Sequence, residues 1–282
     1  MQKKTKIVIL IVLAVLLLAG FTFFVAEFVT EAADWAVFPG SPHVYHAGNM
    51  GSGAVTDREG ILLLDMTNGR QYSSAEAIRK STLHWLGDTN GNISAPAVPS
   101  YASQIAGFDL LNGLYSYGGA GGVAELTLSA KVQCVALEAL GGHKGTVAVY
   151  NYKTGEILCA VTTPTFDPQS PPDVENDPEG LYEGVYMNRF TQSAYTPGSI
   201  FKIVTLAAAL ETLEDAQTMS FTCTGEQAYG VDRITCENVH GTQSLKEAFC
   251  NSCNCAFAQV ADMLGAEVLQ RCADKLGVTE PV

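Results

Sequence analysis

The chain has 282 residues, which is enough for one large domain or two ordinary ones. Apolar residues make up 47% and charged residues 16%, a balance that is typical of a packed globular protein with an additional apolar segment. The formal net charge of -13 argues against a nucleic-acid partner, because a phosphate backbone would repel such a surface, but it leaves a peptide substrate open.

The N-terminal segment has the pattern of a membrane anchor. Three lysines, at positions 3, 4 and 6, precede an apolar run from Ile7 to Val25, and acidic residues follow it. The run is long enough to cross ~30 Å of hydrocarbon as a helix. A cleaved signal peptide is the alternative, but its apolar core has only about 7–15 residues. We therefore expect a single-pass anchor over residues 1–29 in the cell membrane, with the rest of the chain extracytoplasmic.

The next hundred residues predict a linker and a small domain. Residues 26–52 contain several glycines and prolines and are expected to be irregular. Ile61 to Leu64 has the pattern of a short strand, and Ser74 to Leu86 has that of a helix. We expect residues 30–125 to form this linker and an α+β pedestal.

From about Leu126 the hydrophobic periodicity becomes clearer. It predicts a helix over Ala130 to Leu140, and then a hairpin of Gly145 to Tyr150 with Glu156 to Thr162. Residues 164–180 are predicted to form a loop. Ser199 to Leu213 follows as an Ala-rich helix that is apolar on nearly every face, so we expect it to be buried inside a domain.

Ser199 and Lys202 open this helix with a spacing that points to serine acyl transfer. Residues three apart lie on one face of a helix, a single turn from each other. A serine hydroxyl becomes a good nucleophile when a neighbouring base takes its proton, and desolvation and a helix N-terminus favour the neutral lysine that can do so. The first-turn amides also offer donors to an acyl oxyanion. The alternative, a capping serine with a solvent-facing lysine, fits poorly on so apolar a helix.

Ser252 and Asn254 form a second candidate pair in the segment Ser252-Cys253-Asn254. The serine hydroxyl can relay a proton, and the amide can hydrogen-bond both a lysine and a substrate. Alone, this triplet would be an ordinary turn or cap. After a Ser-x-x-Lys element, in this order, it becomes part of the motif set of serine enzymes that react with β-lactams. The predicted catalytic residues are therefore Ser199, Lys202 and Ser252, with Asn254 binding substrate.

The chain has eight cysteines, and in an exported protein they invite a disulfide interpretation. Cys223 and Cys236 could close a loop, but a reducing host would leave them free, and both alternatives remain open. Cys250, Cys253 and Cys255 crowd one segment that lacks a second pair of metal ligands, so they are predicted to be small buried thiols. His240, next to Gly241, is interpreted as a structural loop residue. We expect no metal and no cofactor.

Several segments together resemble the class B penicillin-binding proteins. Tyr195-Thr-Pro-Gly-Ser199-Ile-Phe-Lys202 is similar to the nucleophile segment of that family, and Ser252-Cys-Asn254 to its second motif. Gly145-Thr-Val-Ala-Val is similar to the first strand of its catalytic domain. Val55-Thr-Asp57-Arg58-Glu-Gly60 is similar to the family's "DRNG" element, with Glu59 in place of Asn. The resemblance covers most of residues 53–282.

The resemblance implies an α+β protein: a transmembrane helix, a pedestal, and over residues 126–282 the N-terminal part of a β-lactamase-like transpeptidase domain. It implies a peptidoglycan D,D-transpeptidase without cofactors. Ser199 would be acylated by a stem peptide ending in D-Ala-D-Ala, or by a β-lactam that mimics it. It also implies a polytopic cell-wall glycosyltransferase as partner.

The match to the family pattern has one gap. The third motif, Lys-Thr/Ser-Gly, normally follows Ser-x-Asn, and no such motif follows Asn254. Lys153-Thr154-Gly155 spells it but lies in the predicted hairpin turn, before the nucleophile. We therefore expect a chain truncated before this motif. A non-catalytic scaffold or β-lactam sensor, or a D,D-carboxypeptidase or β-lactamase, remain alternatives.

Overall fold

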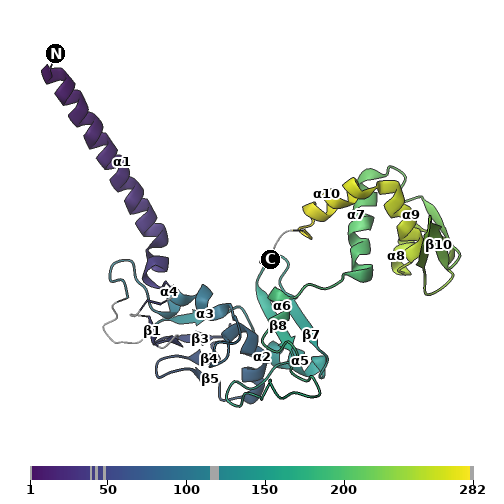
Figure 1. The fold of residues 1–282 in the computed structure, drawn as a ribbon, viewed down its shortest axis with the longest axis horizontal. Coiled ribbons are helices and arrows are strands. Elements are labelled where there is room, and N and C mark those ends of the chain that lie inside the picture. Colours follow the sequence, from purple (N-terminus) through teal and green to yellow (C-terminus); the bar gives the residue numbers. More distant parts are fainter. Residues whose placement is uncertain (1, 39, 42–43, 47–48, 115–120, 280–282) are drawn as a thin grey trace. The chain divides into compact units, whose positions relative to one another are not determined.

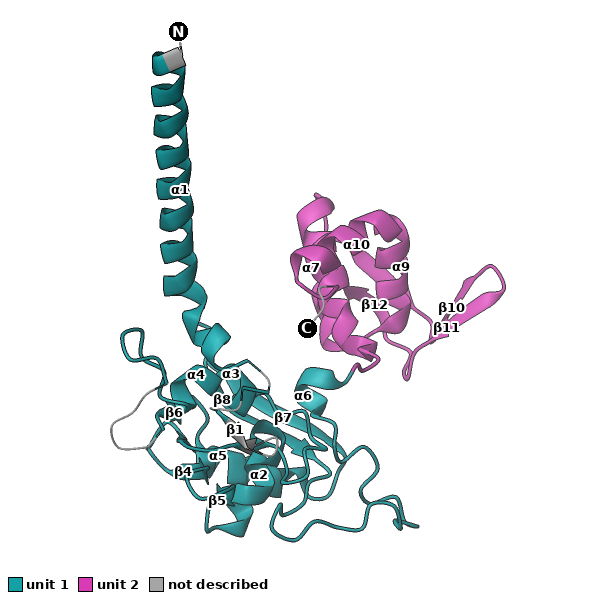
Figure 2. Ribbon diagram, turned by 60° about the vertical axis from the view of Figure 1, so that its left-hand side comes forward, with its two compact units in different colours: residues 1–193 teal, residues 194–282 magenta. Residues whose placement is uncertain are grey.

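The chain folds into two compact units, residues 1–193 and 194–282, which are coloured separately in Figure 2. The structure is a computed structural model, and it describes residues 2–38, 40–41, 44–46, 49–114 and 121–279. Both units mix helices and antiparallel strands, in agreement with the expected α+β class.

The N-terminal helix α1 (Gln2–Ala36) is long and apolar enough to cross a membrane (Figure 1). It extends eleven residues past the predicted end of the apolar run at Val25, so the expectation of an irregular linker from residue 26 is wrong up to Ala36. These residues lack Pro and Gly and include alanines and glutamates, which favour a helix. Part of the predicted linker, at residues 39, 42–43 and 47–48, lies outside the described residues.

A four-stranded sheet forms the base of the first unit, in the order β5-β4-β3-β6. Its strands β3 and β6 are parallel and the other pairs antiparallel. Buried side chains from these strands, among them Val55, Leu64 and Ala124, enter one core with Leu86 and Ile105. The elements are β1 (Tyr45–His46), β2 (Asn49–Met50), β3 (Ala54–Thr56), β4 (Leu62–Asp65), β5 (Gln71–Tyr72), α3 (Ala97–Ser100), α4 (Ala102–Ile105) and β6 (Val123–Glu125).

Two helices and a hairpin complete the first unit, and the sequence predicts all of them. They are α2 (Glu76–Leu86), α5 (Ala130–Leu140), β7 (Gly145–Tyr150) and β8 (Ile157–Thr163), the last two paired antiparallel. The fully buried Gln133 joins three of these elements, because its amide donates to Ser81 O at 3.2 Å and accepts from Ala160 N at 2.9 Å. Lys153-Thr154-Gly155 lies in the turn between the strands, as predicted.

The loop after β8 is held to α2 by an ion pair. Arg79 donates two hydrogen bonds to the carboxylate of Asp167, at 2.8 and 2.6 Å. Both side chains are largely buried, and the hydrogen bond from Arg79 lowers the pKa of Asp167 below its usual value. The short helix α6 (Arg189–Gln192) ends the unit, and the Asn188 side chain caps it by accepting from Phe190 N.

The second unit consists of helices that pack on short antiparallel strands, drawn in magenta in Figure 2. Its core contains Ala208, Phe221, Ala256 and Val260. The elements are η1 (Gly198–Phe201), α7 (Lys202–Thr212), β9 (Ser220–Cys223), β10 (Glu226–Tyr229), β11 (Asp232–Thr235), β12 (Gly241–Ser244), α8 (Leu245–Cys250), α9 (Asn254–Leu264) and α10 (Ala266–Lys275).

Helix α7 differs from its prediction in two respects. Its first turn, from Gly198, is a 3₁₀ helix, and the α-helix begins only at Lys202. The helix is also buried on one face instead of all round: Ala208 and Ala209 are buried, whereas Ile203 and Leu210 are 53% and 49% exposed. Within this unit α9 and α10 pack against it, and two neighbouring helices cover only part of a helix surface.

Asp57, from the "DRNG"-like element, links the β3–β4 turn to helix α5. It is fully buried, and its Oδ1 accepts from the backbone N–H groups of Glu59 and Ile61 at 2.9 and 2.8 Å. Its Oδ2 accepts from Ala130 N at 2.9 Å, in the first turn of α5. One carboxylate therefore satisfies three backbone donors on two elements.

We expect Asp57→Ala to lower the free energy of unfolding by about 3 kcal/mol, because the buried Ala130 N–H and the partly buried N–H groups of Glu59 and Ile61 all lose their acceptor. Asp57→Asn should cost less, about 1–2 kcal/mol, because its amide oxygen still accepts from the turn and only the bond to Ala130 is lost. Urea titration in detergent, followed by the fluorescence of Trp85 in the same unit, measures both. Equal losses in the two variants would contradict the assigned role of Oδ2.

His84 gives the first unit a pH dependence. The imidazole is buried, and its Nε2 lies 2.7 Å from Val185 O, so Nε2–H donates to that carbonyl. Burial lowers the pKa of His84 below the value of about 6.5 that it has in an unfolded chain. Below about pH 6.5 the unfolded chain therefore binds a proton that the folded chain does not, and stability falls as the pH falls.

We expect the free energy of unfolding to decrease from pH 6.5 toward pH 5, and His84 can contribute at most about 1.4 kcal/mol per pH unit to this slope. His84→Gln keeps an N–H donor for Val185 O but does not titrate, so its slope over this range should be smaller. Urea titrations at several pH values give both slopes. If the variant keeps the wild-type slope, His84 is not the group responsible.

Candidate active site

Ser199 and Lys202 come together at the start of α7, as their spacing predicts. Lys202 Nζ donates a hydrogen bond to Ser199 Oγ at 2.8 Å. The preceding Gly198 has φ +53°, a conformation that glycine adopts without strain. The 3₁₀ turn that follows places the two side chains one turn apart, so the departure from a regular α-helix does not separate them.

Ser252 and Asn254 reach the same point from the connection between α8 and α9. Ser252 Oγ donates to Ser199 Oγ at 2.8 Å. Lys202 Nζ also donates to Ser252 Oγ at 3.3 Å and to Asn254 Oδ1 at 2.7 Å. The structure therefore brings together all four residues selected from the sequence. Their catalytic roles remain predictions.

The Ser252 backbone is in the left-handed region, with φ +51°, and no other non-glycine residue in the described part of the chain has a positive φ. Such a conformation costs a residue with a β-carbon roughly 1–2 kcal/mol. The strain is confined to this residue, because the backbone around it keeps its hydrogen bonds. The N–H group of Ser252 donates to Phe249 O, and that of Cys253 donates to Ala248 O. The turn directs the Ser252 hydroxyl toward Ser199.

Asn254 is held in place from its other side. Its Nδ2 donates to Thr235 O at 2.9 Å, at the end of β11. With the nitrogen engaged there, the amide oxygen faces Lys202. The orientation of this side chain therefore depends on where β11 ends.

This geometry allows a proton to be transferred among Ser199, Lys202 and Ser252. Ser199 Oγ lies within hydrogen-bond distance of Lys202 Nζ and of Ser252 Oγ, so a neutral amine could accept the serine proton directly. Ser199 and Ser252 are exposed, which leaves the nucleophile open to a substrate. The arrangement suits acyl transfer through a serine ester.

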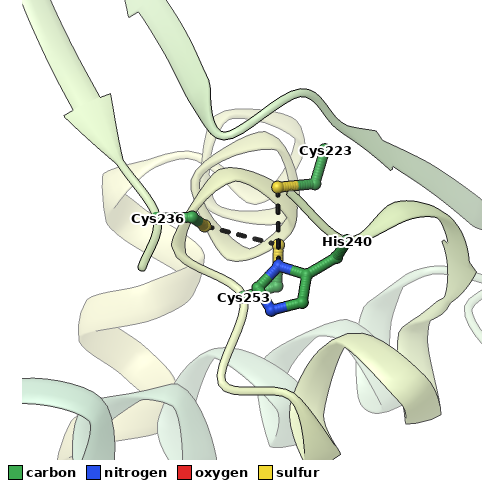
Figure 3. A group of neighbouring side chains, drawn as sticks. All are labelled: Cys223, Cys236, His240 and Cys253. Carbon is green, nitrogen blue, oxygen red and sulfur yellow. Dashed lines mark hydrogen bonds between the residues drawn. The ribbon is translucent and has the colours of Figure 1, made fainter. Parts of the chain in front are cut away.

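A second cluster, which was not predicted from the sequence, lies beside this site. Cys223, Cys236, His240 and Cys253 converge, as Figure 3 shows. No disulfide joins Cys223 to Cys236, so of the two alternatives the structure has the free thiols. His240 was interpreted only as a loop residue, yet its Nδ1 lies 3.5 Å from Cys223 Sγ. The signal in the sequence was the symmetric spacing Cys-x12-Cys-x3-His-x12-Cys.

The cysteines of this region differ in their environments. Cys253 and Cys255 are buried, as predicted, and burial raises the pKa of Cys253 to about 11 and that of Cys255 to about 12. Burial also raises the pKa of Cys223, but hydrogen bonds from the backbone N–H groups of His240 and Gly225 outweigh it and bring the pKa to about 6. Cys250 is exposed, against the prediction, because it ends α8 on the surface.

Comparison with known proteins identifies the family. Residues 145–282 match the family model of the penicillin binding protein transpeptidase domain. The chain belongs to the class B penicillin-binding proteins. The match begins at the first residue of β7 and includes all four residues of the candidate site.

Three relatives illustrate the similarity to penicillin-binding proteins. Stage V sporulation protein D of Bacillus subtilis is 35% identical over 223 residues, which are 76% of this chain and 31% of that protein. Peptidoglycan D,D-transpeptidase PbpA of Mycolicibacterium smegmatis is 30% identical over 185 residues, 57% of this chain and 37% of its own. The crystal structure of the D,D-transpeptidase domain of a peptidoglycan glycosyltransferase from Eggerthella lenta aligns with a TM-score of 0.64 and 26% identity, covering 80% of this chain and 53% of that one.

This penicillin-binding protein chain thus spans about a third of the length of the two curated relatives. The comparisons confirm the family and its mixed α+β fold. The sequence-based domain boundaries at residues 29 and 125 are not tested by them and remain predictions.

Proposed function

We propose that this protein is a peptidoglycan D,D-transpeptidase that works through an acyl-enzyme at Ser199. One observation carries the proposal: Ser199 Oγ is hydrogen-bonded to both Lys202 Nζ and Ser252 Oγ. The names of the relatives support it, since PbpA is called a peptidoglycan D,D-transpeptidase. The donor is a stem peptide ending in D-Ala-D-Ala.

In the first half-reaction Ser199 Oγ attacks the carbonyl carbon of the penultimate D-Ala while Lys202 Nζ takes its proton. The peptide bond breaks, and Ser252 relays a proton to the departing D-Ala amine. In the second half-reaction the amine of another stem peptide attacks the ester and regenerates Ser199. Asn254, held by Thr235 O, offers its amide to Lys202 and the substrate backbone.

The anchor and the partners form part of the same proposal. Helix α1 crosses the cell membrane once, the residues from the end of α1 to 125 form a linker and pedestal, and residues 126–282 belong to an extracytoplasmic transpeptidase domain. β-Lactams acylate Ser199 as substrate mimics, and a polytopic glycosyltransferase supplies the glycan strands. The three lysines before α1's apolar run support this orientation.

We expect a fluorescent penicillin to label this protein in membranes of cells that express it from its natural gene. Ser199→Ala should abolish the label, because the attacking oxygen is lost. Lys202→Ala should slow labelling by about 10²–10⁴-fold, since it removes the proposed base. Gel fluorescence against time, with immunoblotting for protein amount, measures both effects.

Ser220→Ala is the matched control, because Ser220 is an exposed serine of the same unit, on β9. It should label like the wild type. Unchanged labelling of Ser199→Ala would contradict the proposal, and so would the absence of label on wild-type protein, which favours a scaffold. Ser199-dependent release of D-Ala, with hydrolysis of the acyl-enzyme and no crosslinked product, would instead indicate a D,D-carboxypeptidase.

A further inference from the structure

Four potential metal ligands meet beside the Ser252–Asn254 segment. They come from the ends of short strands and from the cap of α9: Cys223 ends β9, Cys236 follows β11, His240 precedes β12, and Cys253 is the N-cap of α9. Their ligand atoms all lie within 4.8 Å of one another, and in Figure 3 the side chains point toward a common centre.

Two distances within the cluster match those of a tetrahedral zinc site. With Zn–S near 2.3 Å and Zn–N near 2.0–2.1 Å, tetrahedral geometry places two sulfurs about 3.8 Å apart and a sulfur and a nitrogen about 3.6 Å apart. Cys236 Sγ and Cys253 Sγ are 3.7 Å apart, and Cys223 Sγ and His240 Nδ1 are 3.5 Å apart. A disulfide needs sulfurs about 2.05 Å apart, well below the observed separation.

The surrounding backbone is arranged for thiolates. Cys236 Sγ accepts from the backbone N–H groups of Asn254 and Cys255 at 3.1 and 3.3 Å. Cys253 Sγ accepts from Ala256 N at 3.4 Å. All three donors belong to the first turn of α9, where free amides favour negative charge. These N–H···S hydrogen bonds from the start of α9 are a second observation, independent of the proximity of the four ligand atoms.

We propose that Cys223, Cys236, His240 and Cys253 bind one zinc ion. Three soft thiolates and one imidazole are a typical set of ligands for tetrahedral zinc. Because four protein ligands leave no open coordination position, the site is structural. On binding, the thiols release their protons and the neutral imidazole coordinates through Nδ1, the nitrogen near Cys223. The proposal replaces the sequence-based expectation of no metal.

The ion holds the segment that carries two residues of the candidate active site. Cys253 lies between Ser252 and Asn254, and Cys236 directly follows Thr235, whose carbonyl accepts from Asn254. Coordination therefore ties the end of β11 and the β12 entry to the first turn of α9. The four ligands are positioning residues, and this part of the inference rests on the proposed function. Zinc binding itself does not.

The test uses the full chain purified in detergent under reducing conditions. Inductively coupled plasma mass spectrometry should find about one zinc ion per chain. Replacing zinc by Co²⁺ should give the intense visible d–d bands of a tetrahedral site with a thiolate charge-transfer band in the near ultraviolet. The cobalt spectrum needs no variant, so it is not affected by loss of folding in a mutant.

Variants assign the ligands. Cys236→Ser and Cys253→Ser should each lower zinc content at least tenfold at micromolar free zinc, whereas Cys250→Ser, an exposed cysteine three residues from Cys253, should retain it. His240→Cys should also retain zinc and add charge-transfer intensity with Co²⁺, because four thiolates still complete a tetrahedron. His240→Ala should weaken binding.

Three results would overturn the zinc site: absence of zinc from zinc-replete protein, zinc retained by Cys253→Ser, or a Cys236–Cys253 disulfide found by mass spectrometry after alkylation. The positioning role is read from penicillin labelling. Chelation of zinc should slow Ser199 labelling at least tenfold, and added zinc should restore it. Zinc bound without any labelling would leave the metal site intact and refute the proposed function alone.

Discussion

The second unit is organised around the amino group of Lys202. Lys202 Nζ lies within hydrogen-bond distance of Ser199 Oγ, Ser252 Oγ and Asn254 Oδ1. These atoms come from η1, from the α8–α9 connection and from the first turn of α9. Because one side chain joins the start of α7 to a segment about fifty residues later in the sequence, the geometry of the site depends on how both regions are held.

At the starts of several helices, a side chain accepts a hydrogen bond from a backbone N–H group of the helix. Asp57 closes a turn and pairs with Ala130 N at the start of α5, and Ser244 with Glu247 forms a capping box on α8. Cys253 caps α9 while it lies between two site residues. At the starts of α5 and α9, therefore, one side chain both satisfies a backbone donor and links the helix to another part of the chain.

Local patterning was enough to predict much of this structure. Helices α2 and α5 and the β7–β8 hairpin follow hydrophobic periodicity and turn residues, and the proximity of Ser199 to Lys202 follows from helical spacing. The length of α1 was underestimated, because the anchor was predicted from its apolar residues alone. Polar residues with a high helix propensity continue the helix to Ala36. The partial burial of α7 depends on which helices cover it, and periodicity does not contain that information.

The Cys/His cluster shows the limit of local reasoning most clearly. Cys253 was grouped with Cys250 and Cys255, its neighbours in sequence, but its neighbours in space are Cys223, Cys236 and His240. Those contacts depend on antiparallel pairing of β9 with β12 and on the hairpin of β10 with β11. The four side chains are 4 to 30 positions apart in the sequence, and their convergence depends on these strand pairings.

The left-handed backbone of Ser252 restricts how this site can evolve. The residue best suited to that conformation is glycine, which has no hydroxyl, and the residues that carry a hydroxyl all pay strain there. Threonine, the nearest chemical substitute, is β-branched and is disfavoured still more at positive φ. Few single substitutions can therefore satisfy both the backbone and the hydrogen bond to Ser199, so adaptive change around this site has to occur at other positions.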